Sequence, residues 1–354
     1  MKKAILPIFL ANAGCLDRCV FCNQRAVERN YCNTLQEEVT AEINRQLLYL
    51  TKTDVQLAFY GGTFTALPDD QQLMLLQLGK NYIDGGKISS IRVSTRPDAL
   101  DDSCVNLLKT FGVTAVEIGA QSLVDSVLIA NNRRHTYDDV ATSVARVKKS
   151  GMTVGIHLMT GLVGETDETN LLTLQRLAQM VPDMLRIHPT IVLRGTKLEQ
   201  LFLEGKYCPQ TMQQAITSAS WLKLVAQSKG ITVIRTGIQP SEELQNGQVV
   251  AGPFHPAFGE LCDSAGFYVL LYILLKRHIV NDLFCSPKDL SKIIGQQRKN
   301  ITRLETKFEK KIILSVSNLI ASGTIETSTC SSTHLSSLVE KLGYNEYKEI
   351  LEDE

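Results

Sequence analysis

Apolar residues recur along the first two thirds of the chain in two alternating patterns. Short apolar runs alternate with longer segments in which apolar residues return every three or four positions. Runs of about five residues are typical of buried strands, and the longer spacing is typical of amphipathic helices. Strands are therefore predicted over residues 4–10, 55–60, 91–94, 113–118, 153–159, 184–188 and 231–235.

Helices are predicted between these strands. Residues 34–50 carry Val39, Ile43 and Leu47 at helical spacing. Caps and glycines supply further boundaries, because polar residues cap helix starts and glycine often follows helix ends. The remaining helices are expected from Asp69, from Asp102 as cap to Gly112, from near Thr136 to Gly151, through Leu171, Leu174 and Leu177, and up to Gly230.

Repeated strand–helix units predict a parallel sheet with right-handed crossovers. Six or so units indicate an α/β fold of the incomplete-barrel type. Functional groups are then expected at the carboxyl ends of the strands. With 354 residues, the chain exceeds the usual size of one domain, so we expect a barrel over residues 1–240, a linker with a helical extension over 241–285 and a small α+β domain over 286–354.

Composition and charge exclude few functions. Hydrophobic residues make up 44% of the chain, which supports a large core, and the 37 basic residues balance the 37 acidic ones. Any case for nucleic acid must therefore be local. Apart from the amino terminus, no apolar run approaches about 20 residues, so no membrane span is expected, and residues 267–275 are expected to form a buried helix.

Three cysteines near the amino terminus carry the strongest chemical signal. Cys15, Cys19 and Cys22 are separated by three and two residues, and Phe21 precedes the last. Three thiolates on a cubane iron–sulfur cluster leave one iron with an open coordination position, as in reactive metal sites. A zinc site would need a fourth ligand in a second pair. Disulfides are disfavoured, because the other cysteines are scattered at Cys32, Cys104, Cys208, Cys262, Cys285 and Cys330.

The first residues also allow a second interpretation. Met1, Lys2 and Lys3 precede an apolar run that ends near the first cysteine, as in a short signal peptide of a lipidated protein. The run is short and Asn12 interrupts it, so a first strand leading into the cysteine loop is the preferred interpretation. A cluster needs a reducing compartment, which points to the cytoplasm.

Polar and glycine-rich segments follow the second and third predicted strands. Gly61, Gly62 and Thr63 come directly after residues 55–60, where glycine lets the backbone approach a ligand closely; an ordinary tight turn is the alternative. Ser94 and Arg96 end the third strand. Arg96 can bind a carboxylate of a ligand with two hydrogen bonds, or it can form a structural salt bridge.

The fourth and fifth strands end in further candidates. Glu117 and Gln121 can each make two hydrogen bonds, and a buried carboxylate is costly unless it is paired, which suggests function. Residues 157–166 contain Gly161 and Gly164, whose backbone can wrap a ligand. Glu165 can instead join the first turn of the next helix, and His157 can be a satisfied core histidine.

One more cluster precedes the predicted helix near residue 136. Arg133, Arg134 and His135 either bind a substrate phosphate or form the solvated start of that helix.

The spacing of Cys15, Cys19 and Cys22 together with Phe21 resembles the radical S-adenosylmethionine (SAM) superfamily. The resemblance implies a partial TIM-like barrel, a 4Fe-4S cluster held by the three cysteines, and SAM chelated to the free iron. It further implies reductive cleavage of SAM to a 5′-deoxyadenosyl radical that abstracts hydrogen from the substrate. The residues expected to bind SAM are Phe21, Gly61, Gly62, Thr63, Ser94, Arg96, Glu117, Gln121, Gly161 and Gly164.

Longer strings resemble a particular branch of that superfamily. FYGGTFTALP, STRPDAL, VEIGAQS, NRRHTYDDV and GPFHPAFGE resemble the radical SAM half of the Elongator catalytic subunit family, which modifies tRNA. That family spaces its cysteines more widely, and this chain ends without room for its acetyltransferase domain. The cysteine spacing itself is closer to oxygen-independent coproporphyrinogen III oxidase.

The carboxyl-terminal part carries a local basic excess. Residues 288–311 contain eight Lys or Arg and three Asp or Glu. Within them, residues 293–312 resemble a KH RNA-binding core, which implies contacts to RNA by Lys292, Gly295, Arg298 and Lys299. A solvated basic helix and a helix-turn-helix with Ile301 and Leu304 in its core are the alternatives.

The expected function is that of a radical SAM enzyme acting on RNA, with tRNA as the first candidate. A radical SAM oxidoreductase acting on a small molecule such as a tetrapyrrole is the second candidate. A non-catalytic cluster or haem carrier is the third. An electron donor such as flavodoxin or ferredoxin is expected as a partner.

Overall fold

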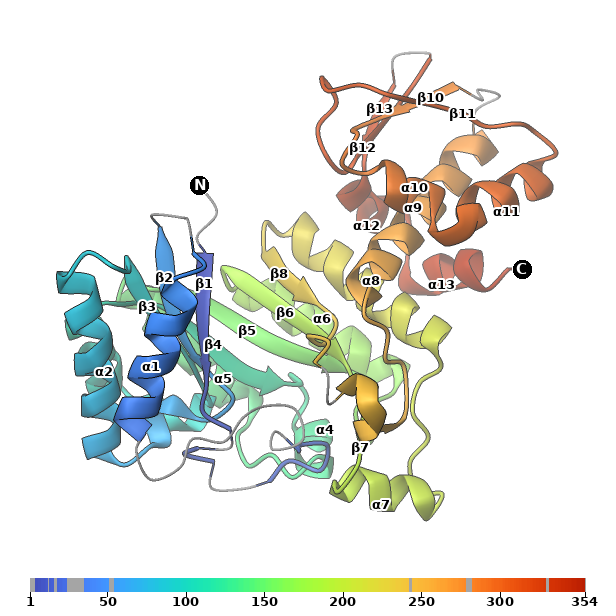
Figure 1. Cartoon of the computed structure of the whole chain (residues 1–354). Helices are drawn as coiled ribbons and strands as arrows, with labels where there is room; N and C mark the ends of the chain where they lie inside the picture. The colour runs from blue at the N-terminus through green and yellow to red at the C-terminus, as the bar shows by residue number, and fades with distance from the viewer. Residues whose placement is uncertain are drawn as a thin grey trace. The chain divides into compact units, whose positions relative to one another are not determined.

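A computed structural model describes residues 4–11, 13–15, 18–23, 35–50, 54–241, 244–277, 282–328 and 331–353 (Figure 1). Cys32, Cys330, Asn12 and the amino-terminal Met1, Lys2 and Lys3 lie outside these residues. The chain divides into two compact units. Unit 1 comprises Met1–Arg186, Thr190–Pro209 and Pro240–Gly252, and unit 2 comprises Ile187–Pro189, Gln210–Gln239 and Pro253–Glu354. The domain boundaries expected at residues 240 and 285 differ from this division and stay a prediction.

Seven strands form one curled sheet in the order β1-β2-β3-β4-β5-β6-β8, which is the α/β half-barrel that the sequence predicts. Strands β1 to β5 pair in parallel. All seven strands coincide with predicted ones, to within three residues at each end. Their bounds are β1 Ala4–Phe9, β2 Val55–Tyr60, β3 Ser90–Thr95, β4 Val113–Gln121, β5 Thr153–Thr160, β6 Met184–Pro189 and β8 Thr232–Thr236.

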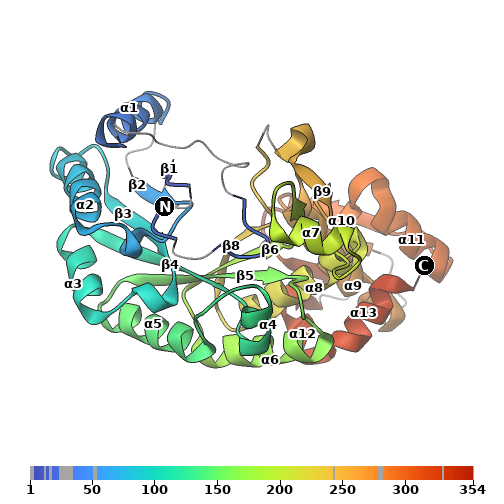
Figure 2. The same cartoon turned by 90° about the horizontal axis from the view of Figure 1, so that it is seen from below.

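Helices of unit 1 connect these strands, and α2, α3 and α5 lie along one face of the sheet (Figure 2). Asp101 rather than the predicted Asp102 caps α3, because its side chain accepts a hydrogen bond from the Cys104 backbone. Thr136 caps α5 as predicted. The helices are α1 Leu35–Leu47, α2 Asp69–Asp84, α3 Asp102–Thr110, α4 Asp125–Ala130, α5 Tyr137–Lys149, α6 Asp167–Met180 and α7 Lys197–Leu203.

Short elements of unit 1 were not predicted from the sequence. These are α4, α7 and the two-stranded sheet formed by β7, Val192–Leu193, and β9, Val249–Ala251. A two-residue strand and a helix of six residues are too short to produce a recognisable period.

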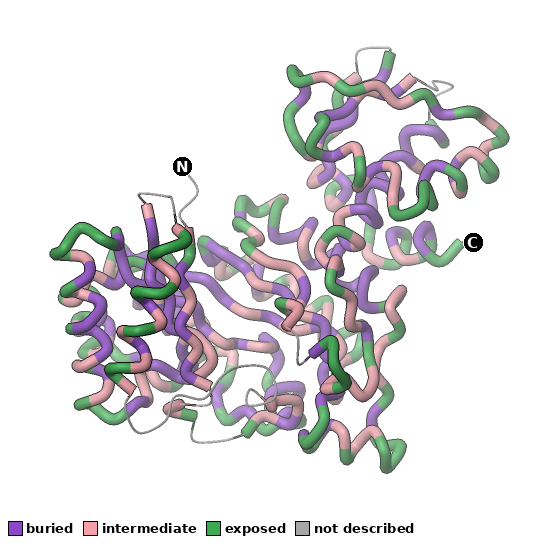
Figure 3. Tube along the Cα trace, in the orientation of Figure 1, coloured by how far each residue is buried: buried purple, intermediate pink, exposed green. Residues whose placement is uncertain are grey.

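The two faces of the unit 1 sheet differ in polarity. Leu57 and Ile91 point toward α2, where a Cβ at Gly79 would lie 2.6 Å from the Ile91 side chain. The opposite face carries polar side chains on successive strands, with Ser94 of β3 and Glu117 of β4 in register with each other and with Gly155 of β5. Most residues of these strands are buried, with half-buried ones between them (Figure 3). Parallel strands are usually apolar on both faces, so the polar face is unusual.

Unit 2 contains a second sheet of four strands in the order β11-β10-β12-β13. The strands are β10 Asp282–Cys285, β11 Ile313–Val316, β12 Thr324–Thr327 and β13 Ser332–His334. The helices of this unit are α8 Met212–Ser228, α9 Phe258–Arg277, α10 Leu290–Ile294, α11 Lys299–Phe308, α12 Leu338–Lys341 and α13 Tyr344–Glu352. Trp221 of α8 packs on Tyr347 of α13 with ring centroids 5.0 Å apart.

Helix α9 bears on the expectation that no segment spans a membrane. Its 20 residues have a mean hydropathy of 1.5 in their most apolar window, so by length and composition alone the helix could cross a membrane. Of that window, 67% is buried inside the protein, which is typical of a core helix, and the predicted buried segment at residues 267–275 lies within it.

Candidate functional site

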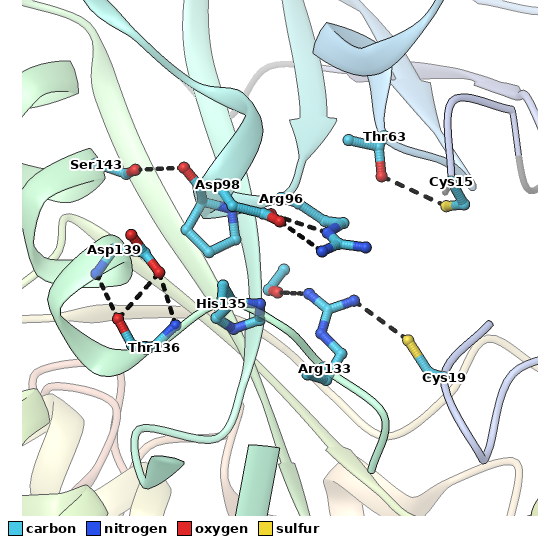
Figure 4. A network of polar contacts seen from close by, with 12 residues as sticks. Cys15, Cys19, Thr63, Arg96, Asp98, Arg133, His135, Thr136, Asp139 and Ser143 are labelled. Carbon is cyan, nitrogen blue, oxygen red and sulfur yellow. Dashed lines mark hydrogen bonds and ion pairs between the residues drawn. The ribbon is translucent and has the colours of Figure 1, made fainter. Parts of the chain in front are cut away.

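The cysteine loop packs tightly against the loop that follows β2. The Thr63 backbone donates a hydrogen bond to the Ala13 carbonyl at 2.9 Å, and Cys15 Sγ lies 3.4 Å from Thr63 Oγ1 (Figure 4). A Cβ at Gly62 would lie 2.2 Å from the Ala13 carbonyl oxygen, and one at Gly14 would lie 2.3 Å from the Thr63 carbonyl oxygen. Both glycines are therefore needed for the two backbones to come this close.

Gly61 adopts a φ of +88°, a conformation that glycine adopts readily. The predicted Gly61–Gly62–Thr63 candidates thus lie beside the cysteine loop. In this structure Gly62 faces the cysteine loop backbone.

Arg133 contacts the cysteine loop from the other side. Its Nη1 donates to Cys19 Sγ at 3.2 Å, and its Nη2 donates to the Gly119 carbonyl (Figure 4). Arg133 and His135 are only 6% and 2% exposed, so for these two residues the predicted solvated helix start is wrong. His135 Nε2 donates to the Ala120 carbonyl at 3.1 Å, and burial together with Arg133 lowers the pKa of His135 to about 4.

Phe21 anchors the same loop in apolar surroundings. It packs against a cluster that includes Val20, Val192 and Leu198, and against a second cluster that includes Val127 and Leu162. The aromatic side chain therefore holds the third cysteine near the sheet.

The three cysteines suit a cluster in their chemistry, but their thiols are not gathered. Cys15 is exposed, Cys19 and Cys22 are half-buried, and the Cys22 backbone donates to the Cys19 carbonyl at 3.1 Å. Among the residues that the structure describes, no three Cys, His, Asp or Glu side chains form a group that could hold a metal ion. The donor set of three cysteines thus fits a cluster.

Arg96 pairs with a neighbouring carboxylate. Its Nε and Nη2 donate to the two carboxylate oxygens of Asp98 at 2.9 and 2.5 Å (Figure 4). Burial would raise the pKa of Asp98, but the Arg96 guanidinium holds it below its usual value. Of the two predicted uses of Arg96, the structure therefore shows the salt bridge. Ser94 lies on β3, which ends just before Arg96, and is half-buried on the polar face.

Glu117 is the centre of a network on the polar face. Tyr60 Oη donates to Glu117 Oε1 at 2.8 Å, Arg92 Nη1 donates to the same oxygen at 2.8 Å, and Arg186 Nε donates to Oε2 at 3.0 Å. Burial alone would raise the pKa of Glu117, but Arg186 and Arg92 hold it below its usual value. Tyr60, Arg92 and Arg186 were not predicted as its partners, because they lie on strands far apart in the chain.

Two other predicted residues of the polar face differ from Glu117. Gln121 ends β4 with a φ of +67°, and its buried Oε1 has no hydrogen-bond partner among the described residues. A free acceptor at this edge is available to a ligand. His157 is half-buried, and desolvation and the nearby Arg186 lower its pKa to about 3, so it is neutral.

The loop after β5 is held by Glu165. Its carboxylate accepts hydrogen bonds from the Gly161 and Leu162 backbones at 2.8 and 3.3 Å. Glu165 therefore does not join the first turn of α6, which was the alternative prediction; it lies before the helix cap Thr166. Gly161 and Gly164 both adopt a φ of +78°, and Tyr207 Oη donates to the Gly161 carbonyl at 2.7 Å.

The predicted RNA contacts in unit 2 have different surroundings. Lys292 is paired with Asp263 at 3.0 Å and lies 3.8 Å from Asp289. Arg298 and Lys299 are exposed at the start of α11, and Arg298 lies 3.8 Å from Glu305.

Gly295, with a φ of +76°, separates α10 from α11. Ile301 and Leu304 are buried, as the helix-turn-helix alternative predicts.

Comparison with known families identifies most of this chain. The sequence model of the Radical SAM superfamily matches residues 11–177, and that of the Radical_SAM C-terminal domain matches residues 182–265. The first match begins within the cysteine loop and ends in α6, so it covers the candidate residues of the polar face on β2 to β5.

Individual relatives match a shorter stretch. The tRNA uridine(34) acetyltransferase of Methanocaldococcus jannaschii is 28% identical over 191 residues, which are 48% of this chain and 35% of that protein. Elongator complex protein 3 of Homo sapiens is 31% identical over 205 residues, 52% of this chain and 37% of that protein. The chain thus matches little more than a third of the length of these relatives.

A solved structure shares the fold. The archaeal Elp3 of Methanocaldococcus infernus, with its first residues deleted, matches with a TM-score of 0.56 and 20% identity, covering 77% of this chain and 63% of that chain. The cysteine loop, the half-barrel and the two family matches agree with one another. The chain belongs to the radical SAM superfamily, whose members are enzymes that use a 4Fe-4S cluster and S-adenosylmethionine.

Proposed function

We propose that this radical SAM enzyme modifies RNA, with tRNA as its substrate. One observation carries the proposal: the cysteine loop is seated on the Gly61–Thr63 loop at the carboxyl edge of the half-barrel, where α/β barrels place their chemistry. Similarity to a tRNA uridine(34) acetyltransferase supports RNA as the substrate of this chemistry.

Cys15, Cys19 and Cys22 would hold the cluster in this proposal. When bound and reduced, the cluster supplies one electron that cleaves SAM and generates a 5′-deoxyadenosyl radical. Gln121 supports SAM binding through its free carbonyl oxygen. Thr63 Oγ1 lies 3.4 Å from Cys15 Sγ, so Thr63 would adjoin SAM bound at the cluster. The other residues proposed to bind SAM are Phe21, Gly61, Gly62, Ser94, Arg96, Gly161 and Gly164. Glu117 is not retained among them, because Tyr60, Arg92 and Arg186 engage both oxygens of its carboxylate.

The barrel shields a radical from water and oxygen in this proposal. The surroundings of the cysteine loop support such shielding, because Phe21 of the loop packs into two apolar clusters and Arg133 covers Cys19.

Unit 2 supplies the proposed RNA contacts. Arg298 and Lys299 are exposed at the loop between α10 and α11, where they can reach phosphate oxygens. Lys292 is engaged by Asp263, so its proposed contribution is to hold the loop rather than to contact RNA. A flavodoxin or ferredoxin is the proposed electron donor, and the cytoplasm is the proposed compartment, because a cluster needs a reducing environment.

Formation of 5′-deoxyadenosine tests the proposed chemistry. Full-length protein is reconstituted with iron and sulfide without oxygen, reduced and incubated with SAM. We expect 5′-deoxyadenosine; its absence from protein that carries the cluster would favour the non-catalytic carrier.

Co-purification at low salt tests the RNA substrate. Bound tRNA supports the proposal, whereas protein free of RNA that still cleaves SAM supports a small-molecule substrate such as a tetrapyrrole. The cysteine spacing is the observation that favours this second candidate. Low salt matters because phosphate contacts weaken steeply as salt rises.

A further inference from the structure

The network around Glu117 carries more positive than negative charge. Two guanidiniums, Arg92 and Arg186, donate to one carboxylate. Tyr60 adds no charge, because burial and Glu117 raise its pKa. His157 adds none either, because its pKa is lowered to about 3. The group therefore carries a net charge of one positive unit at neutral pH.

This charge is held away from bulk water. The side chains of Arg92 and Arg186 are 12% and 21% exposed, and that of Glu117 is 6% exposed. An unbalanced charge in such surroundings is costly unless an anion approaches it. The remaining exposure of both guanidiniums leaves a route for a ligand on the polar face of the sheet.

Each guanidinium also keeps one unused nitrogen. Arg92 donates through Nε to Gln56 and through Nη1 to Glu117, so that Nη2 makes no hydrogen bond with the described residues. Arg186 donates to Glu117 through Nε and Nη2, so that its Nη1 makes no hydrogen bond with the described residues. Guanidinium groups match the planar oxygen pairs of carboxylates and phosphates, so these nitrogens are suited to an oxyanion.

Surrounding contacts fix the position of both arginines. Gln56 Oε1 accepts from Arg92 at 2.7 Å, and the Arg186 guanidinium lies 5.4 Å from the centre of the Tyr60 ring. Strands β2 to β6 thus present a rigid donor pair.

We propose that Arg92 and Arg186 bind an oxyanion of the substrate, a phosphate or a carboxylate, and that Glu117 and Tyr60 act as positioning residues. This inference rests on the proposed placement of the reaction at the carboxyl edge of the half-barrel, but not on RNA as the substrate. An RNA backbone supplies a phosphate, and a small acid supplies a carboxylate.

Thermal unfolding in the presence of small oxyanions tests the proposal. Full-length protein is titrated with inorganic phosphate or with acetate up to about 50 mM, with sodium chloride replaced to hold ionic strength constant. We expect a saturable rise in Tm with at least one of the two anions. Tighter binding of phosphate identifies a phosphate group in the substrate, and tighter binding of acetate identifies a carboxylate.

Variants assign this effect to the site. Arg186→Gln is expected to weaken the apparent anion affinity at least tenfold. Arg146→Gln is the matched control. It removes an arginine of α5 that pairs with Asp102 of α3, and this variant is expected to bind the anion as wild type does. Where Arg186→Gln does not fold, Arg186→Lys replaces it. This variant keeps the positive charge but loses the paired N–H donors of the guanidinium, so it is expected to bind the anion more weakly than wild type does.

Two results would overturn the inference. One is the absence of any saturable effect on wild-type Tm, and the other is equal anion affinity in wild type and the folded Arg186 variants. Formation of 5′-deoxyadenosine, measured on the same wild-type preparations, reports the proposed function separately.

Discussion

Two groups of basic residues in this protein differ in how far nearby acids neutralise them. On the polar face of unit 1, Arg92 and Arg186 come from strands 94 positions apart in numbering and share one carboxylate. In unit 2, the basic residues are contiguous in sequence, but Lys292 pairs with Asp263, and Arg303 and Lys307 contact the end of α13 near Asp353. Counting charges along the sequence therefore overstates the positive charge that unit 2 exposes. It also does not detect the positively charged network around Glu117 in unit 1.

The reason is topological. Parallel strands bring residues that are distant in sequence to one level of a sheet, so that their charges add. A short helical segment instead places neighbouring charges in different directions, and nearby acids neutralise several of them.

The largest effect is expected for the cysteine loop. Cys19→Ala should abolish cluster colour and SAM cleavage, because only two thiols of the motif remain. Iron content and 5′-deoxyadenosine are measured after anaerobic reconstitution. Cys208→Ala, at an exposed cysteine outside the loop, is the control and should retain both. Full cleavage by the Cys19 variant would contradict the ligand assignment.

A large effect is also expected where the two loops touch. Gly62→Ala places a Cβ 2.2 Å from the Ala13 carbonyl oxygen, so the loops must separate. We expect a loss of stability of about 1–3 kcal/mol, as for other overpacked sites, and reduced iron content. Urea denaturation and iron analysis measure both quantities.

The control for this variant is Gly343→Ala. Gly343 has a φ of −85° and no atom within 4 Å of a built Cβ. Normal iron content in the Gly62 variant would show that the contact between the loops does not position the cysteines.

A pH-dependent effect is expected from the polar face of unit 1. Burial and Arg186 lower the pKa of His157 to about 3, from about 6.5 in the unfolded chain. Protonation therefore favours the unfolded state, so stability is full above pH 6.5 and falls as the pH is lowered. The slope expected from one such histidine is about 1.4 kcal/mol per pH unit.

Removal of this histidine should flatten the profile. His135, whose pKa is lowered to about 4, acts in the same direction, so His157→Gln should remove about half of the slope between pH 6 and 5. Urea denaturation at several pH values measures the slope.

The smallest effects are expected in unit 2. Replacing Arg298 and Lys299 by Glu should weaken RNA binding several-fold and leave SAM cleavage intact, because both side chains are exposed. Lys292→Met should lower stability and leave RNA affinity near the wild-type value, because Lys292 is paired with Asp263. Equal RNA affinity in all variants would remove unit 2 from the RNA site.

The seven strands of the unit 1 sheet and the longer helices between them could be predicted from the sequence, because buried parallel strands and amphipathic helices leave clear periods. The short strands and helices of unit 2 were not predicted. The cap of α3 was misplaced by one residue, since Asp101 and Asp102 are chemically equal and only backbone geometry distinguishes them. Phe21 and the cysteines were found because they are neighbours in sequence.

Arg92, Arg186 and Tyr60 could not be predicted as partners of Glu117. Their association depends on sheet order and register, which no local pattern specifies. The cost of a buried carboxylate correctly indicated that Glu117 has partners, but not which ones.

The close approach of the two loops at Gly14 and Gly62 bears on when the protein can acquire its cluster. The cysteine loop packs on the Gly61–Thr63 loop, and this contact forms only after β1 and β2 have paired, because the Gly61–Thr63 loop follows β2. Iron and sulfide delivered to a nascent chain that ends before residue 60 would find three thiols on an unsupported segment. Cofactor insertion should therefore follow synthesis of the second strand, and a folded apoprotein is the natural acceptor.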